Sequence, residues 1–213
     1  MKKYLLFLNP DTTVTKSAIQ ELLNFYINNN NVGIVSPLLI NENLKPFSTQ
    51  SKKELTPFNA LFSFSLLRKL FVDKSIYSDP FFKKWDYKKP IESETIPGAA
   101  FMISRDLFDK INGFDENFFL YFEENDISKR VRQLGYKLFI NPKSKIIHKV
   151  AQSTVQIKDR DEIFKNSRLK YFKKHYGLLV ALFVEGFLYI NKKNIAGAVL
   201  IVFLLLFCYN IVT

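Results

Sequence analysis

The chain has a single cysteine among its 213 residues, and this scarcity excludes two kinds of structure. Cys208 can form no disulfide within the chain, and it cannot build a cysteine-based metal cluster. The N-terminus lacks the small-residue cleavage site of a secretory leader, and its apolar run of five residues stops at Asn9-Pro10-Asp11. We therefore expect this N-terminal run to be a buried strand of a folded domain. Internal repeats and low-complexity linkers are also lacking in the sequence.

Acidic side chains are too few to balance the basic ones, with 20 Asp and Glu against 31 Lys and Arg, so the net charge is +11. A strongly basic chain suggests a nucleic-acid partner. However, the surplus is concentrated between Lys143 and Lys193, beside strongly apolar runs, and no nucleic-acid-binding motif is recognisable. This distribution suits an anionic membrane surface better. We expect a membrane partner and no nucleic acid.

What the sequence has in abundance is apolar side chains, which make up 47% of it and include 22 Phe. Up to about residue 153 these side chains alternate between strand-like and helix-like runs, which predicts an α/β fold. The first strand, Tyr4 to Leu8, is expected to be buried and parallel. Thr15 is expected to cap the first helix. That first helix is expected over 16–28 and further helices over 58–71, 106–111 and 127–134, and the other expected strands are 32–40, 44–48, 136–140 and 145–148.

After about Ser153 the character of the sequence changes. Residues 158–175 predict a basic helix, and residues 178–190 form an apolar segment that is too short to span a bilayer and carries Glu185, which favours an interfacial or re-entrant position. Residues 195–213 would rise about 28 Å as a helix, close to the about 30 Å of a bilayer core. We expect that segment to be membrane-inserted, with a buried core helix as the alternative. The expected divisions are 1–153, a basic amphipathic helix over 154–176, and membrane-associated helices over 177–213.

An acidic cluster follows the apolar residues 118–122, at the start of the helix that Gly135 ends. Glu123, Glu124 and Asp126 lie on the first turn of this helix, where the positive end of the helix dipole favours carboxylates. Since an unpaired buried charge is costly, carboxylates behind an apolar wedge are expected either in a cleft or in ion pairs. An ordinary acidic cap on a helix is the alternative interpretation.

Three separated stretches of the sequence together resemble a known family. They are Leu6-Phe-Leu-Asn-Pro-Asp-Thr12, then Pro97-Gly-Ala-Ala-Phe-Met-Ile-Ser-Arg105, then 113–126 with Gly135-Tyr136 and His148 behind it. This ordered set resembles the inverting family-2 glycosyltransferases of GT-A fold, in particular the rhamnosyltransferase-like branch. The resemblance covers residues 4–153, and a weaker one extends over 170–177. It implies a partial GT-A, Rossmann-like mixed sheet flanked by helices, with hydrophobic helices at the C-terminus.

The resemblance implies a metal site at Asp11, which matches the family's variant of the Asp-x-Asp motif. Asp11 would bind a divalent cation, Mg²⁺ or Mn²⁺, that bridges the diphosphate of a nucleotide-sugar donor, and such hard cations prefer carboxylate and phosphate oxygens. His148 matches a histidine that joins the metal shell in some relatives. A purely structural histidine is the alternative for this residue.

The same resemblance implies an acceptor site. Glu124 would be the general base that removes the proton from the acceptor hydroxyl, and Glu123 and Asp126 would position the acceptor or cap the helix. Gly98 and Ala99 would line the floor where donor sugar and acceptor meet. Many relatives have Asp in place of Glu124, and the extra methylene moves the carboxylate by about 1 Å, a misplacement that can reduce rates strongly.

The expected function is sugar transfer, with inversion, from a nucleotide sugar to a growing lipid-linked bacterial surface glycan at the cytoplasmic face of the inner membrane. The family's nucleotide-binding half would precede Tyr4. We therefore expect no transferase activity from residues 1–213 alone, and a separately encoded N-terminal half is a candidate partner. The alternative is an inactive, membrane-anchored remnant or accessory module. The DNA upstream of Met1 distinguishes the two, according to whether it encodes the missing strands.

Overall fold

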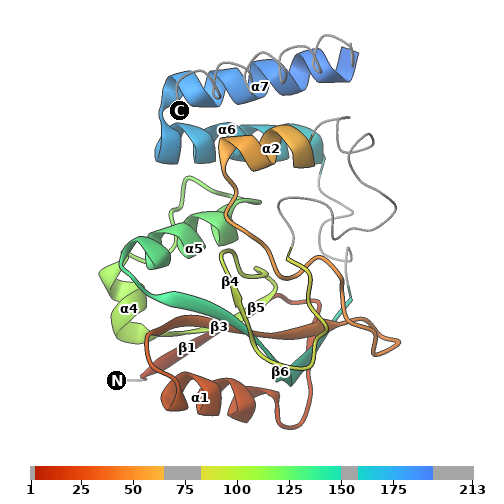
Figure 1. Cartoon of the computed structure of the whole chain (residues 1–213), viewed down its shortest axis with the longest axis vertical. Coiled ribbons are helices and arrows are strands. Elements are labelled where there is room, and N and C mark those ends of the chain that lie inside the picture. Colours follow the sequence, from red (N-terminus) through yellow and green to blue (C-terminus); the bar gives the residue numbers. More distant parts are fainter. Residues whose placement is uncertain (1–2, 65–82, 150–157, 194–213) are drawn as a thin grey trace. The chain divides into compact units, whose positions relative to one another are not determined.

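The computed structural model describes residues 3–64, 83–149 and 158–193 of the chain (Figure 1). These residues divide into two compact units. The first lies within Met1–Glu54 and Phe82–Arg168, and the second within Leu55–Phe81 and Leu169–Thr213. Helix α6, Arg160–Tyr176, contributes residues to both units.

The first unit is built on a mixed sheet with the strand order β1-β5-β3-β6-β2, with β4 also pairing with β6. β3 and β6 run parallel to each other, and the other pairings are antiparallel. The strands are β1 Tyr4–Leu8, β2 Thr12–Val14, β3 Val32–Ile40, β4 Ile91–Ser93, β5 Ala100–Ser104 and β6 Lys137–His148. The central strand β3 is buried along its whole length, as expected for a largely apolar run.

Helices cover both faces of this sheet (Figure 1). Helix α1, Ala18–Asn28, lies on one face, and α4, Arg105–Lys110, and α5, Glu123–Gln133, lie on the other. Successive strand residues point to opposite faces, so Ile34 packs in the core beneath α4 and α5 whereas Val35 packs beneath α1. The expected mixed α/β fold with flanking helices is therefore confirmed.

Close packing of α5 on the sheet depends on a glycine in β3. A Cβ atom added at Gly33 would lie 2.5 Å from the Val131 Cγ1 atom and 2.7 Å from the Tyr136 Cβ atom. Neither distance is possible for real carbon atoms, so only glycine allows the helix and the following strand to approach β3 this closely. Gly33 therefore fixes the distance of α5 from the sheet.

The second unit contains α2, Pro57–Ser63, the C-terminal part of α6 and α7, Leu178–Lys193. Thr56 caps α2, because its Oγ1 atom accepts a hydrogen bond of 3.1 Å from the Asn59 amide. The Tyr176 hydroxyl donates to the Leu55 carbonyl at 3.3 Å. Four side chains of α7 are buried, namely Ala181, Val184, Phe187 and Leu188.

Two predictions about the N-terminal part were wrong. β1 is antiparallel to β5 and lies at the end of the strand order, so it is an edge strand that is only partly buried. Thr15 does not cap the first helix, since its hydroxyl donates instead to the Lys145 carbonyl at 2.7 Å and the helix begins after Ser17. In both cases the deciding contact comes from a segment remote in the sequence.

Local irregularities caused two further errors. Residues 44–48 form no strand: Leu44 adopts a left-handed φ of 57°, and the pairing there is a single bridge between Ile40 and Pro46. The two strands expected around Pro142 are one strand, β6, which continues through an irregularity where its pairing with β3 shifts from Asn141 to Lys145.

The expected membrane segment at 195–213 and the expected boundary at 153 lie outside the described residues, as does the later part of the helix expected over 58–71. None of the helices in the described ranges is both long and apolar enough to cross a bilayer. The apolar segment after Gly177 is observed as helix α7.

Candidate active site

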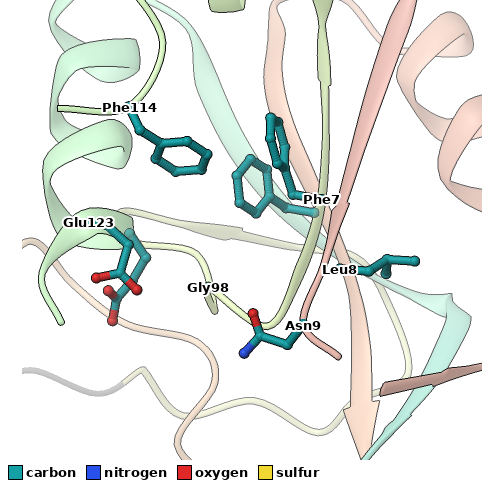
Figure 2. A pocket seen from close by; sticks show the side chains of 8 residues that line it. Phe7, Leu8, Asn9, Gly98, Phe114 and Glu123 are labelled. Atoms are coloured by element: carbon teal, nitrogen blue, oxygen red, sulfur yellow. The ribbon is translucent and has the colours of Figure 1, made fainter. Parts of the chain in front are cut away.

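A pocket of about 210 Å³ opens where three separated parts of the first unit meet (Figure 2). The end of β1 supplies one wall, the turn before β5 supplies the floor, and the start of α5 supplies the acidic wall. The residues that line it are Phe7, Leu8, Asn9, Gly98, Phe101, Phe114, Glu123 and Glu124. The pocket thus brings together residues from the three stretches that carry the family resemblance.

An unusual backbone turn delivers the two carboxylates to this pocket. Tyr121 and Phe122 both adopt left-handed φ values, 67° and 71°, directly before α5 begins at Glu123. Each such residue costs about 1–3 kcal/mol, so the surrounding packing must hold this conformation. The rings of both residues pack against Phe164, with centroid distances of 5.3 and 5.1 Å. Because α5 starts after this turn, both carboxylates lie on its first turn.

The floor of the pocket is tight on its acidic side. A Cβ atom added at Gly98 would lie 3.3 Å from the Glu124 Cβ atom and 3.9 Å from the Glu123 Oε1 atom. The Asn9 amide donates to the Ala99 carbonyl at 2.9 Å, which ties the end of β1 to the same turn. Gly98 therefore leaves just enough space for the carboxylates to lie beside the end of β1.

The two carboxylates have different electrostatic surroundings. Burial, followed by repulsion from the neighbouring Glu124 carboxylate, raises the pKa of Glu123 from 4.5 to about 7, and Lys52 opposes this shift. The Glu123 Oε2 atom is buried and has no hydrogen-bond partner among the described residues. The Lys52 Nζ atom lies 3.9 Å from the Glu124 Oε1 atom. Burial and the neighbouring carboxylate therefore favour the protonated form of Glu123 at the pocket wall.

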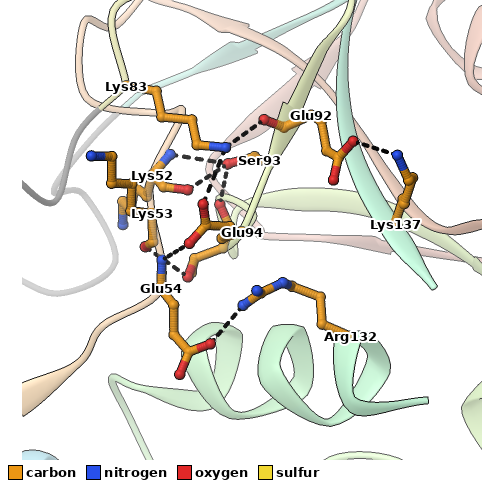
Figure 3. Close-up of polar contacts among 10 residues, drawn as sticks. Lys52, Lys53, Glu54, Lys83, Glu92, Ser93, Glu94, Arg132 and Lys137 are labelled. Atoms are coloured by element: carbon orange, nitrogen blue, oxygen red, sulfur yellow. Dashed lines mark hydrogen bonds and ion pairs between the residues drawn. The ribbon is translucent and has the colours of Figure 1, made fainter. Parts of the chain in front are cut away.

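Lys52 belongs to a polar network that attaches its segment to the rest of the unit (Figure 3). The Glu54 carboxylate pairs with Lys129 at 2.6 Å and with Arg132 at 2.7 Å, so the segment is fixed to α5. The Ser93 hydroxyl donates to the Lys52 carbonyl and accepts from the Lys52 amide, each at 3.0 Å. The position of Lys52 is thus set by backbone contacts and by its neighbour Glu54.

The two expected metal ligands lie together at another position. The His148 Nε2 atom is 3.3 Å from the Asp11 Oδ1 atom, because β2 pairs with β6 in a register that places Thr12 opposite His148. Two ligand atoms at about 2.1 Å from an octahedral ion lie about 3 Å apart, so this pair fits one coordination shell. Among the described residues no group of three or more His, Cys, Asp or Glu side chains is placed to hold a metal. Neither residue lines the pocket.

Asp126, expected near the acceptor, lies elsewhere. Its side chain is 1% exposed and accepts a hydrogen bond of 2.7 Å from the Arg130 Nε atom, one helical turn later. The Arg130 guanidinium also donates to the Ile111 carbonyl at 2.6 Å. This is an internal ion pair, so we leave Asp126 out of the proposed site. Ala99 is buried, and it contributes its carbonyl to the contact with Asn9.

Sequence reasoning missed Lys52 and Asn9 as residues of this region. Lys52 was missed because its contact with Glu124 joins segments that are far apart in sequence and belong to no recognised motif. Asn9 stands within the Asn-Pro-Asp stretch, and its place directly after β1 was the signal that could have identified it.

Comparisons with known proteins agree with this picture. A family model described as the N-terminal domain of galactosyltransferase matches residues 79–152. Residues 79–152 are thus similar to a glycosyltransferase domain. The N-acetylglucosaminyl-diphospho-decaprenol L-rhamnosyltransferase of Mycobacterium tuberculosis (strain CDC 1551 / Oshkosh) is 30% identical over 59 residues, which are 28% of this chain and 19% of the relative. The predicted resemblance to glycosyltransferases is therefore confirmed.

A second relative matches over a longer part of the domain. The low-salt glycan biosynthesis hexosyltransferase Agl10 of Haloferax volcanii is 30% identical over 132 residues, which are 62% of this chain and 38% of the relative. The chain thus spans less than two fifths of the length of either relative. A crystal structure of GalNAc-T7 with UDP, GalNAc and Mn²⁺ matches with a TM-score of 0.47 and 20% identity, over 68% of this chain and 27% of that chain.

Proposed function

We propose that the chain is part of an inverting glycosyltransferase of the GT-A type, which transfers a sugar from a nucleotide-sugar donor to a growing glycan. The observation that carries this proposal is the pocket itself. It joins Asn9, Gly98 and the Glu123–Glu124 pair, which come from three separated stretches of a glycosyltransferase domain. At about 210 Å³ it is smaller than the about 300–1,000 Å³ of pockets that enclose drug-sized ligands. It suits the reacting end of a sugar better than a whole nucleotide sugar.

In this proposal Glu124 is the general base. It removes the proton from the acceptor hydroxyl while the hydroxyl oxygen forms a bond to the anomeric carbon from the face opposite the leaving group. The bond from that carbon to the diphosphate oxygen breaks, and its electron pair departs with the nucleoside diphosphate. Gly98 supports the step by leaving room beside Glu124, and the aromatic wall of Phe7, Phe101 and Phe114 excludes water.

Asp11 and His148 would hold the divalent cation, Mg²⁺ or Mn²⁺. When bound, such an ion neutralises negative charge that develops on a departing diphosphate. Their carboxylate and imidazole supply two adjacent ligands, and oxygen atoms of the donor diphosphate would complete the shell. The Haloferax and Mycobacterium relatives are named as a hexosyltransferase and a rhamnosyltransferase, which supports a hexose or deoxyhexose as the transferred sugar.

We also propose that the acceptor is lipid-linked and that the protein works at the cytoplasmic face of a bacterial inner membrane. The name of the Mycobacterium relative contains a polyprenol diphosphate, which supports such an acceptor. Several large apolar side chains of α7 are exposed, with Leu179 82% exposed and Leu182 53%. Exposed lysines precede them on α6, namely Lys170, Lys173 and Lys174. An apolar stripe next to basic side chains is typical of a helix that lies in the surface of an anionic membrane.

The metal assignment is tested by nucleotide binding. We expect the protein to bind a nucleoside diphosphate more tightly when Mn²⁺ is present, and we expect Asp11→Ala to remove this dependence on Mn²⁺ with little loss of stability. Asp109→Asn is the matched control, since Asp109 is exposed and pairs with Arg105. Isothermal titration calorimetry measures both. Unchanged Mn²⁺-dependent binding by Asp11→Ala would refute the assignment.

The second candidate is an inactive, membrane-anchored accessory module. It is favoured by the placement of Asp11 and His148, since neither of them lines the pocket that holds Glu124. The calorimetric experiment separates the two proposals, because an accessory module of this kind would bind the nucleotide no better with Mn²⁺ than without it.

A further inference from the structure

The acidic wall of the pocket contains two neighbouring carboxylates, and the proposed function gives the role of general base to only one of them. Glu123 and Glu124 are successive residues on the first turn of α5, and both reach the pocket (Figure 2). Two carboxylates that share one site do not ionise independently, because the charge on one disfavours charge on the other. A difference in the surroundings of the two carboxylates therefore decides which one is ionised and can act as a base.

The structure places a positive charge closer to one of the two carboxylates. Lys52 belongs to the segment between β3 and α2, and its Nζ atom lies 3.9 Å from the Glu124 Oε1 atom. The side chains of Lys52 and Glu124 are 21% and 20% exposed, so water screens the attraction only in part. Glu123 has the opposite surroundings, since its Oε2 atom is buried without a hydrogen-bond partner among the described residues, and a negative charge there is costly.

The other charged side chains near the start of α5 have partners of their own. Asp126 pairs with Arg130 inside the unit at 2.7 Å, and Lys129 and Arg132 share the Glu54 carboxylate. Lys52 is the cation that the structure places against the acidic pair within the described residues. Its backbone is fixed by Ser93, so a change of its side chain should leave its segment in place (Figure 3).

We propose that Lys52 is a positioning residue, which holds the negative charge of the acidic pair on Glu124 and thereby leaves the shared proton on Glu123. This proposal rests on the proposed function only in the role that it gives to Glu124 as the base. An ionised Glu124 can accept the proton of an acceptor hydroxyl. A protonated Glu123 can donate a hydrogen bond to an oxygen of the acceptor, and it reduces the repulsion that a second negative charge would exert on the nucleotide diphosphate.

The raised pKa of Glu123, caused by burial and by the Glu124 charge, agrees with this division. It also predicts what a change at Lys52 should do. Without the cation, only the difference in burial favours charge on Glu124 over Glu123, so part of the shared proton should move to Glu124. With arginine at position 52 the positive charge remains, and the division should persist.

The test is a pH titration of the carboxyl groups in residues 1–213, monitored by ¹³C NMR in the absence of donor and metal. In the wild type the Glu123 carboxyl resonance should move between pH 5 and 8, as the proton of the pair is lost from this residue. In Lys52→Gln part of this movement should appear at the Glu124 resonance, and Lys52→Arg should restore the wild-type pattern. Lys53→Gln, a change at the exposed neighbouring lysine, should have no effect. Amide spectra of each variant establish that it is folded.

Two outcomes would overturn the inference. One is a wild-type titration in which Glu124 carries the proton, and the other is a Lys52→Gln variant with the wild-type pattern. Neither depends on catalysis, so failure of the proposed function would appear separately, as absence of Mn²⁺-dependent nucleotide binding. In an active form of the protein, Lys52→Gln should also move the acidic limb of the pH–rate profile to higher pH, because a merely structural role for Lys52 would lower the rate equally at every pH.

Discussion

At the scale of single residues, the two carboxylates of the pocket show how burial can separate chemically identical groups. Glu123 and Glu124 differ by one position on the same helical turn. Burial places Glu123 where charge is costly, whereas Glu124 faces Lys52 at 3.9 Å. Family resemblance identified both residues, but only the structure distinguishes their surroundings.

The raised pKa of Glu123 makes a prediction about stability. Between pH 4.5 and about 7 the folded state holds a proton on Glu123 that the unfolded state has lost. The free energy of unfolding should therefore fall as the pH rises through this range, by about 1–2 kcal/mol, less than the full shift would give because the pair is partly exposed to solvent. Glu123→Gln should remove this loss, and Glu116→Gln, at an exposed site, should not. Urea unfolding at pH 5 and pH 8 measures it, and an unchanged pH dependence in Glu123→Gln would contradict the assignment.

At the scale of elements, the placement of α5 decides the geometry of the pocket, because both carboxylates stand on it. Gly33 sets how closely this helix packs on β3, and Glu54 ties it to the segment of Lys52. A change at either contact should therefore alter the geometry of the pocket as well as the free energy of unfolding.

Gly33→Ala tests the close packing. The added methyl group would meet Val131 and the backbone-linked Cβ atom of Tyr136, neither of which can move far, so we expect a loss of about 1–3 kcal/mol of unfolding free energy. Gly186→Ala in α7 is the control, because nothing lies within 4 Å of its added Cβ atom and alanine favours helix by about 0.5–1 kcal/mol. Circular dichroism during urea unfolding measures both. Equal stability of the two variants would show that α5 is not limited by Gly33.

Glu54→Gln tests the bridge between α5 and the segment of Lys52. The substitution removes the negative charge that pairs with Lys129, which is 9% exposed, so we expect destabilisation by about 1–3 kcal/mol. Glu42→Gln removes an ion pair whose carboxylate is 66% exposed, and it should cost less than about 1 kcal/mol. Thermal unfolding compares the two variants. If Glu54→Gln and Glu42→Gln lost the same stability, the ion pairs of Glu54 would contribute no more than an exposed ion pair.

At the scale of the whole molecule, the sequence predicted the elements better than their pairing. The strand over 32–40 was confirmed at both ends, because its apolar run is bounded by polar residues. The antiparallel direction of β1 depends on Ala100–Ser104, far along the chain, and no local pattern reveals it. The same dependence on remote segments explains which residues of the site the sequence could predict. Residue types and motifs identified Glu123, Glu124 and Gly98, whereas the ion pair with Lys52 arises only when remote segments fold together.

The proposed membrane contact can be tested on vesicles. Replacing Lys173 and Lys174 by Gln should weaken binding to vesicles of phosphatidylglycerol and phosphatidylcholine by about tenfold or more, since each lysine near an anionic surface adds about 1 kcal/mol. The matched control replaces Lys88 and Lys89, an exposed pair in the first unit. Co-sedimentation at low and high salt measures binding. A protein that binds no vesicles at either salt concentration would contradict the membrane proposal.

The measurement that tests the central claim most directly is the release of nucleoside diphosphate from a nucleotide sugar in the presence of acceptor and Mn²⁺. It is made with this chain and, in parallel, with the chain joined to any sequence encoded upstream of Met1. The account predicts that Glu124→Gln reduces the rate by about 10²–10⁴-fold, as expected for loss of a general base, while Asp109→Asn retains it. Turnover by Glu124→Gln at the wild-type rate, or no turnover of any nucleotide sugar in either form, would contradict the account.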